Sequence, residues 1–148
     1  MLRFARDYCP SRRAVFKIDD DMVLHPMNIF KQDNFTNFAI YGTIGLDKPV
    51  VRDAQSKWYM SNVSYANETY PPYAFGSAYV VNTKAIEPLI EAAESSCEYT
   101  HIEDIFITGF IASRAGVPLE EPLNWLILDQ PSALAEFERG GARVGYAE

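Results

Sequence analysis

The chain has 148 residues, 48% of them hydrophobic and 22% charged, which excludes a disordered, coiled-coil or collagen-like chain. Thirteen basic residues against twenty acidic ones give a formal net charge of −7, which argues against a nucleic-acid partner. No apolar run approaches the roughly 18 residues of a membrane span, and no signal peptide is recognisable at the start. We therefore expect residues 1–148 to form one domain.

The first predicted strand covers residues 14–18, a short, apolar and β-prone segment that we expect to be buried. It leads directly into Asp19, Asp20 and Asp21. Three acids in a row cannot continue a buried strand, so they should lie at its carboxyl end, where open α/β sheets bind ligands. Their carboxylates offer hard oxygen ligands to Mg²⁺ or Mn²⁺, and the alternative is an acidic turn that only faces solvent.

The middle of the chain alternates between expected helix and strand. A helix is predicted over residues 28–37, two strands joined by a turn over 40–44 and 48–52, and another strand over 79–81. This alternation favours an α/β fold.

An aromatic and proline-rich segment spans residues 57–76. Two consecutive prolines exclude a helix interior there. Gly76 permits a backbone conformation or a close ligand approach that a Cβ atom would obstruct. The aromatic side chains are either core and turn residues or flat platforms that suit a sugar, and the candidates are Trp58, Tyr59, Tyr70 and Tyr73.

Two helices are predicted in the second half. Residues 83–96 form the first, with Pro88 disturbing its early part. Thr100 and Glu103 fit a capping box, T-x-x-E, that opens the second helix, and Gly116 ends it.

The acidic pair Glu103–Asp104 at the start of this helix has two interpretations. Acids favour a helix N-terminus in any case, and Glu103 is accounted for by the capping box. The functional alternative is a carboxylate that takes a proton from a nucleophile. In that case Asp104 is free to point into a cleft as the base.

Three N-x-[ST] sequons lie in the first half of the chain, at Asn34, Asn62 and Asn67. They favour a lumenal protein, although no signal peptide accompanies them. Cys9 and Cys97 are too few for a disulfide framework, and the sequence leaves their redox state open.

The order of these motifs resembles a known family. Cys9-Pro10 is followed by V-F-K-I-D-D-D over residues 15–21, K-W-Y over 57–59, Y-P-P-Y-x-x-G-x-x-Y-V over 70–80 and E-D-I-F over 103–106. This series resembles the β-1,3-galactosyltransferase family. These inverting glycosyltransferases include β-1,3-N-acetylglucosaminyltransferases and, more distantly, the Fringe enzymes. The resemblance covers about residues 8–118; Ser77 replaces a motif glycine, and Thr108 stands where many members have glycine.

The resemblance implies a GT-A fold, an α/β architecture with a mixed sheet flanked by helices. It implies a UDP-sugar donor, Mn²⁺ (or Mg²⁺) as cofactor, and transfer to a glycan on a glycoprotein or glycolipid in the Golgi lumen. Members are usually membrane-anchored, with a stem and the first nucleotide-binding strands ahead of the residues that match Cys9-Pro10. The chain is therefore expected to be an N-terminally truncated, incomplete catalytic domain that transfers no sugar by itself.

The resemblance also assigns roles to individual residues. The acids Asp19, Asp20 and Asp21 match the metal motif, with Asp21 as the direct ligand. Glu103–Asp104 matches the acidic pair that supplies the catalytic base, and Asp104 is the expected base. The segment that shapes the sugar site contains Trp58, Tyr70, Tyr73 and Gly76.

Two alternatives remain at this point. One is a catalytically inactive or binding-only domain of the same fold. The other is a cytosolic module that binds a divalent metal or a carbohydrate, which gives no reason for three sequons.

Overall fold

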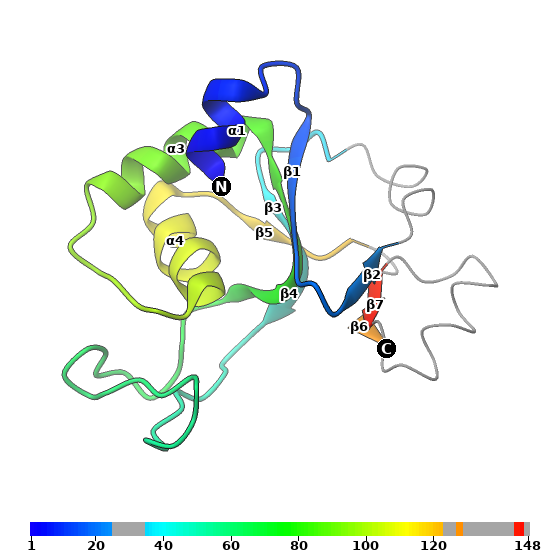
Figure 1. Ribbon diagram of the computed structural model, residues 1–148. Coiled ribbons are helices and arrows are strands. Elements are labelled where there is room, and N and C mark those ends of the chain that lie inside the picture. The colour runs from blue at the N-terminus through cyan, green and yellow to red at the C-terminus, as the bar shows by residue number, and fades with distance from the viewer. Residues whose placement is uncertain (25–34, 123–126, 129–143, 147–148) are drawn as a thin grey trace.

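The computed structural model describes residues 1–24, 35–122, 127–128 and 144–146. A four-stranded mixed sheet forms the centre (Figure 1). Its strands are, in order across the sheet, β1 (Ala14–Ile18), β4 (Tyr73–Asn82), β3 (Ile40–Gly45) and β5 (Leu119–Glu120). β4 pairs antiparallel with both β1 and β3, whereas β3 pairs parallel with β5.

A second, three-stranded sheet has the order β2-β7-β6. It consists of β2 (Met22–Leu24), β7 (Val144–Tyr146) and β6 (Ile127–Leu128). The helices lie on the opposite side of the central sheet from this small sheet (Figure 1). They are α1 (Leu2–Tyr8), α3 (Thr83–Glu94), the π-helix η1 (Ile105–Ile111) and α4 (Ala112–Ala115).

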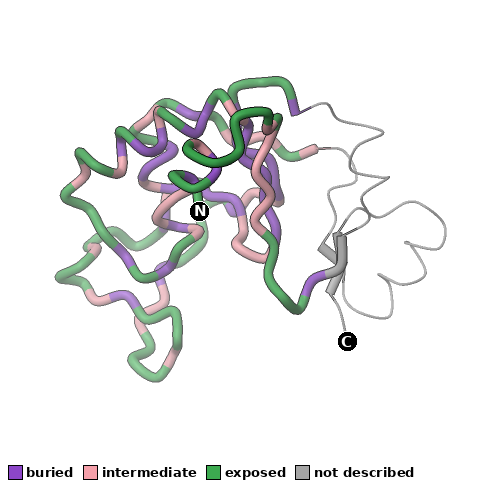
Figure 2. Tube along the Cα trace, turned by 45° about the horizontal axis from the view of Figure 1, so that its top comes forward, coloured by how far each residue is buried: buried purple, intermediate pink, exposed green. Residues whose placement is uncertain are grey.

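The main core lies between the central sheet and these helices. Tyr79 and Ile40 of the sheet and Leu89 of α3 are fully buried within it. Full burial of one such apolar side chain stabilises a fold by about 1.5–3 kcal/mol. Figure 2 shows buried residues along the sheet and the inner sides of the helices, with a mostly exposed loop between β3 and β4. In the described parts of the chain, no helix has the length and apolar character needed to cross a membrane.

The α/β fold is confirmed, and several element boundaries differ from expectation. β1 is only half-buried because it is an edge strand that pairs with β4 alone. Residues 48–52 form no strand; Pro49 makes only an isolated bridge to Thr69, since proline offers no N–H for a ladder. The helix expected over residues 28–37 falls mostly outside the described residues, and 35–37 are not helical.

The two predicted helices of the second half are confirmed, with changes in their detail. α3 runs through Pro88 and ends at Glu94. The second helix is π-helical over Ile105–Ile111 and continues as α4. Gly116 ends it in the left-handed conformation, with φ 65°, which glycine adopts without steric cost.

A bulge in β4 shapes the rest of the molecule. Ile44 of β3 pairs with Ala74 and Gly42 pairs with Tyr79, so residue 43 faces residues 75–78 of β4. The β4 backbone therefore leaves the β3 ladder here, and its polar groups become available to side chains.

Cys9 and Cys97 are both exposed free cysteines. Cys9 lies near the start of α3, because the Arg12 carbonyl accepts a hydrogen bond from Thr83. Cys97 follows the end of the same helix at Glu94, about 18 Å further along the axis. This separation exceeds the reach of a disulfide, so the two cysteines do not pair with each other.

Candidate active site

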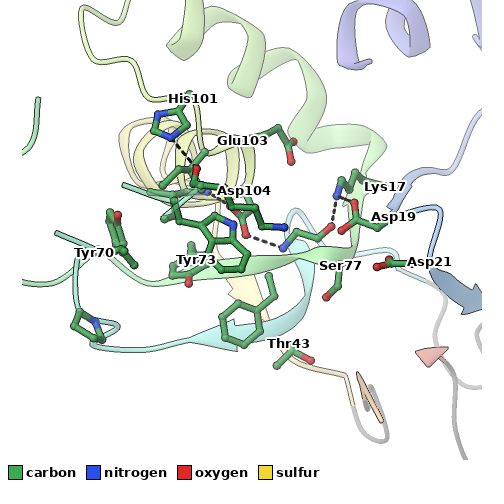
Figure 3. A pocket seen from close by; sticks show the side chains of 18 of the residues that line it. Lys17, Asp19, Asp21, Thr43, Tyr70, Tyr73, Ser77, His101, Glu103 and Asp104 are labelled. Atoms are coloured by element: carbon green, nitrogen blue, oxygen red, sulfur yellow. Dashed lines mark hydrogen bonds and ion pairs between the residues drawn. The ribbon is translucent and has the colours of Figure 1, made fainter. Parts of the chain in front are cut away.

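A cleft of about 1090 Å³ opens beside the end of β1 and the β4 bulge. In Figure 3, Asp19 and Asp21 lie at one end, Tyr70 and His101 at the other, and Asp104 between them. The expected site residues that line it are Asp19, Asp21, Trp58, Tyr70, Tyr73, Gly76, Glu103 and Asp104.

The remaining expected residues lie elsewhere. Asp20 is exposed and is not part of the cleft lining. Asn62 and Asn67 are exposed on the loop between β3 and β4. Asn34 lies outside the described residues.

The acidic loop follows β1 as expected, and all three of its side chains are exposed. Lys17 of β1 donates to the Asp19 carboxylate and to the carbonyl of Gly76. The Asp19 amide donates to the carbonyl of Ser77 at 3.0 Å. The loop is therefore fixed to the β4 bulge, and Lys17 neutralises part of its charge.

These side chains fit a hard cation only in part. Within the described part of the chain, no three His, Cys, Asp or Glu side chains are grouped closely enough to hold a metal ion. Asp19 and Asp21 nevertheless present carboxylate oxygens to one cleft. This set suits an ion that takes one or two carboxylates from the protein and its other ligands from water and substrate phosphates.

Asp104 is held by two backbone amides. Its Oδ2 accepts from the N–H of Gly76 at 2.8 Å, and its Oδ1 accepts from the N–H of Ile105 at 2.8 Å. Each carboxylate oxygen keeps a further lone pair for a ligand in the cleft. Asp104 is thus a half-buried, oriented acceptor, as a general base requires.

Gly76 explains how Asp104 comes so close to β4. A Cβ atom at this position would lie 3.1 Å from Asp104 Oδ2 and 3.2 Å from Asp104 Cβ, tighter than ordinary contacts. Without a side chain, Gly76 leaves room for the Asp104 carboxylate. The sequence alone had left open whether Gly76 serves a backbone conformation or the close approach of a ligand.

With Asp104 as the base that the resemblance implies, we expect Gly76→Ala in the full-length protein to displace the Asp104 carboxylate by a few tenths of an ångström and to lower kcat about tenfold, because small misplacements of reacting groups are costly. The KM for the donor should change little. Gly109→Ala is the matched control, since its Cβ would meet its nearest neighbours at 3.4 Å, an ordinary contact. Steady-state kinetics would contradict the expectation if both variants behaved alike.

Glu103 does not cap the helix, contrary to the capping-box prediction. Its carboxylate accepts a hydrogen bond from the hydroxyl of Tyr79, a fully buried residue. Thr100 accepts from the amide of Ile102 at 3.2 Å. The buried Tyr79 therefore draws Glu103 towards β4, away from the end of the helix.

Glu103 is exposed as a residue, but its carboxyl points to Tyr79, and the partial loss of water around it raises its pKa; the charges of Asp104 and Asp19 raise this pKa further. The hydrogen bond from Tyr79 and the charge of Lys17 lower the same pKa but do not compensate. Burial also raises the pKa of Tyr79, and the Glu103 charge adds to this.

The raised pKa makes a prediction about stability and pH. The folded state favours protonated Glu103, so stability falls as pH rises from the ordinary value of 4.5 through the raised pKa. Glu103→Gln stays neutral, and its amide oxygen can still accept from Tyr79. The difference in melting temperature, variant minus unchanged protein, should therefore be larger at pH 7 than at pH 4. Equal differences at the two pH values in thermal unfolding would contradict this.

The other end of the cleft is aromatic. Trp58 is 53% exposed, and the Lys57 ammonium lies 4.4 Å from the centroid of its ring. Tyr73 lies on β4 and not in the preceding loop, and burial raises its pKa to about 12. Tyr70 is buried, and its hydroxyl has no hydrogen-bond partner among the described residues. These rings form an apolar wall with few polar atoms.

Arg52 holds the loop that carries Trp58. Its guanidinium donates to three backbone carbonyls, each at 2.8 Å, those of Met60, Tyr65 and Asn67. Sequence reasoning missed Arg52 because carbonyl acceptors leave no trace in the residue pattern. It also missed Lys17 and Tyr79. Alternation along the strands could have indicated that both side chains face the site, because residues two apart on a strand share a face.

The chain matches known proteins over most of its length. A family model described as galactosyltransferase matches residues 1–122. The chain is 30% identical over 120 residues to the lactosylceramide 1,3-N-acetyl-beta-D-glucosaminyltransferase of Homo sapiens and 32% identical over 120 residues to that of Rattus norvegicus. Each of these alignments covers 77% of this chain and 31% of the relative. It is 28% identical over 123 residues to beta-1,3-galactosyltransferase 5 of Pan troglodytes, covering 81% of this chain and 41% of that protein.

The chain thus spans less than half the length of these curated relatives. The matched residues include the acidic loop, the β4 bulge and the acidic pair at 103 and 104. The mixed sheet with flanking helices is consistent with a partial GT-A domain. From the family model and these relatives together, the chain belongs to the galactosyltransferase family, which confirms the resemblance read from its motifs.

Proposed function

We propose that the protein is an inverting hexosyltransferase, which moves galactose or an N-acetylhexosamine from a UDP-sugar to a glycan, in a β-1,3 linkage. One observation carries the proposal. The cleft presents an oriented carboxylate, Asp104, between the acidic loop at one end and an aromatic wall at the other. These three parts suit transfer of a sugar from a diphosphate, in which a cation can bind the diphosphate, a base can take the proton of the acceptor and aromatic rings can hold the sugar.

The acidic loop would hold Mn²⁺, or Mg²⁺ in its place, through Asp21 with Asp19 beside it. Lys17 engages the Asp19 carboxylate, whereas Asp21 has no side-chain partner in the described part of the chain. Asp21 is therefore the better direct ligand. When bound, the ion neutralises negative charge on the diphosphate leaving group.

Asp104 acts as the general base. A hydroxyl of the acceptor donates a hydrogen bond to the free lone pair of its carboxylate and loses the proton there as it attacks the anomeric carbon. The amides of Gly76 and Ile105 keep the carboxylate oriented during this step. Attack on the face opposite the leaving diphosphate converts an α-linked donor into a β-linked product.

The aromatic wall would position the sugars. Apolar faces of a pyranose ring pack against aromatic rings, and the exposed Trp58 offers such a face, with the buried Tyr70 and Tyr73 lining the cleft beside it. The acceptor glycan belongs to a glycoprotein or a glycolipid in this proposal. A relative named for lactosylceramide supports the glycolipid class.

The proposed location is the lumenal side of the Golgi membrane, by analogy with the family. The sequon at Asn62 supports a lumenal setting because it lies on an exposed turn. Asn67 instead donates to the Tyr65 hydroxyl at 3.2 Å, and its sequon includes Thr69 of the bridge to Pro49. Asn62 is therefore the preferred acceptor for N-glycosylation.

The test is a donor panel. The full-length protein is incubated with Mn²⁺, a glycan acceptor and, in turn, UDP-galactose, UDP-N-acetylglucosamine or UDP-N-acetylgalactosamine. The expected result is transfer from one donor, with a β-1,3 linkage in the NMR spectrum of the product. An α-linked product would contradict inversion, and UDP binding without transfer from any donor would favour a binding-only domain.

A further inference from the structure

Thr108 is a fully buried residue of the π-helix η1, and its hydroxyl is saturated with hydrogen bonds. Its Oγ1 accepts from the N–H of Ala74 at 2.9 Å. The same oxygen lies 3.0 Å from the carbonyl oxygen of Ala74 and 2.6 Å from that of Asp104. The single hydroxyl proton is available to either carbonyl. Thr108 therefore ties the helical turn that begins at Asp104 to the backbone of β4.

This tie is the second of two between the same pair of elements. The first is the hydrogen bond from the Gly76 amide to the Asp104 carboxylate. Ala74 and Gly76 are two residues apart on β4, while residues 104 and 108 are about one helical turn apart. The two hydrogen bonds therefore hold this turn to β4 at two points.

The position of the tie matters because the β4 bulge begins after Ala74. Ala74 and Gly76 have no partner on β1, which pairs only with residues 78–82 of β4, so their backbone groups bond side chains instead. The Gly76 amide bonds Asp104, the Gly76 carbonyl bonds Lys17, and Ala74 bonds Thr108. Thr108 thus fixes β4 next to Gly76, the residue whose amide holds the Asp104 carboxylate.

We propose that Thr108 is a positioning residue for Asp104. Its hydroxyl fixes the turn from 104 to 108 against β4 and so keeps the Asp104 carboxylate in line with the reacting hydroxyl. Thr108 itself touches no substrate, since it is fully buried and does not line the cleft. The inference rests on the proposed function, in which Asp104 is the base.

The kinetic test, in the full-length protein, compares Thr108→Val, which keeps the shape but loses the hydroxyl, with Thr108→Ser, which keeps the hydroxyl. Per folded molecule, Thr108→Val should lower kcat about tenfold at an unchanged donor KM, because a displaced base loses its alignment. Thr108→Ser should restore kcat. In an Asp104→Asn background, Thr108→Val should cause no further fall in kcat, although it still lowers the melting temperature.

A purely structural role predicts otherwise: unchanged kcat per folded molecule in Thr108→Val, or the same tenfold fall with Asp104→Asn present. Either result would overturn the proposal.

Hydrogen exchange tests the same link without activity. In Thr108→Val the amide of Gly76 should exchange about tenfold faster, as in local opening, while the amide of Leu89 in α3 keeps its rate. Unchanged exchange at Gly76 would overturn the proposal. If Asp104→Asn keeps full activity, the proposed function fails in its assignment of the base, and the exchange result still decides whether Thr108 holds Asp104.

Discussion

In the full-length protein, Asp104→Asn is expected to lower kcat by about 10² or more, the usual scale for a positioned general base. The amide that replaces the carboxylate cannot take a proton from the acceptor hydroxyl. It also has one acceptor oxygen where the two backbone amides of Gly76 and Ile105 need two, so one of these hydrogen bonds is lost. That loss should cost about 1 kcal/mol of stability, much less than unfolds a domain.

The measurement is a kinetic comparison at equal amounts of folded protein, with donor binding followed separately. Donor affinity should stay close to that of the unchanged protein, since Asp104 acts on the acceptor. Asp47→Asn is the matched control: Asp47 is exposed, is not part of the cleft lining and has φ 48°, which asparagine tolerates. If Glu103→Gln abolished turnover and Asp104→Asn spared it, the roles of the two acids would be exchanged.

In the full-length protein, Asp21→Asn is expected to abolish turnover that depends on Mn²⁺ and to leave the fold intact. The fold should survive because Asp21 is exposed and follows the end of β1 in a turn. A neutral amide oxygen is a much weaker ligand than a carboxylate for a hard divalent cation. The melting temperature should therefore match that of the unchanged protein while Mn²⁺ binding weakens.

Electron paramagnetic resonance of free Mn²⁺ measures this binding directly, without catalysis. Asp20→Asn is the comparison at the neighbouring residue, whose side chain is equally exposed but does not line the cleft. We expect it to bind Mn²⁺ more nearly as the unchanged protein does. Full Mn²⁺-dependent turnover in Asp21→Asn would disprove the metal assignment. A larger loss of Mn²⁺ binding in Asp20→Asn than in Asp21→Asn would identify Asp20 as the direct ligand.

The sequence determined the α/β class and most of the residues that line the cleft. Strand β1 and the acids that follow it were predictable because a run of charge cannot continue an apolar strand. Helix α3 and the end of the last helix at Gly116 were predictable because helical spacing and a left-handed glycine are local properties. Helix α1 was not predicted.

Only the tertiary structure decided which group bonds which. The spacing of the capping box predicted that Glu103 caps the helix. Its carboxylate instead accepts a hydrogen bond from the buried Tyr79, 24 residues away. Gly76 was recognised as a close-approach position, but the group that approaches is Asp104, which lies 28 residues further on.

The β4 bulge is the physical reason for these differences. The bulge and the end of β1 leave backbone groups of Ala74 and Gly76 without strand partners, and side chains distant in sequence satisfy them. Local patterns record the residue types Lys17, Asp104 and Thr108, but not the hydrogen bonds that join them to one strand. The sequence therefore determined the chemical groups of the site, and the pairing of strands β3 and β4 decided their geometry.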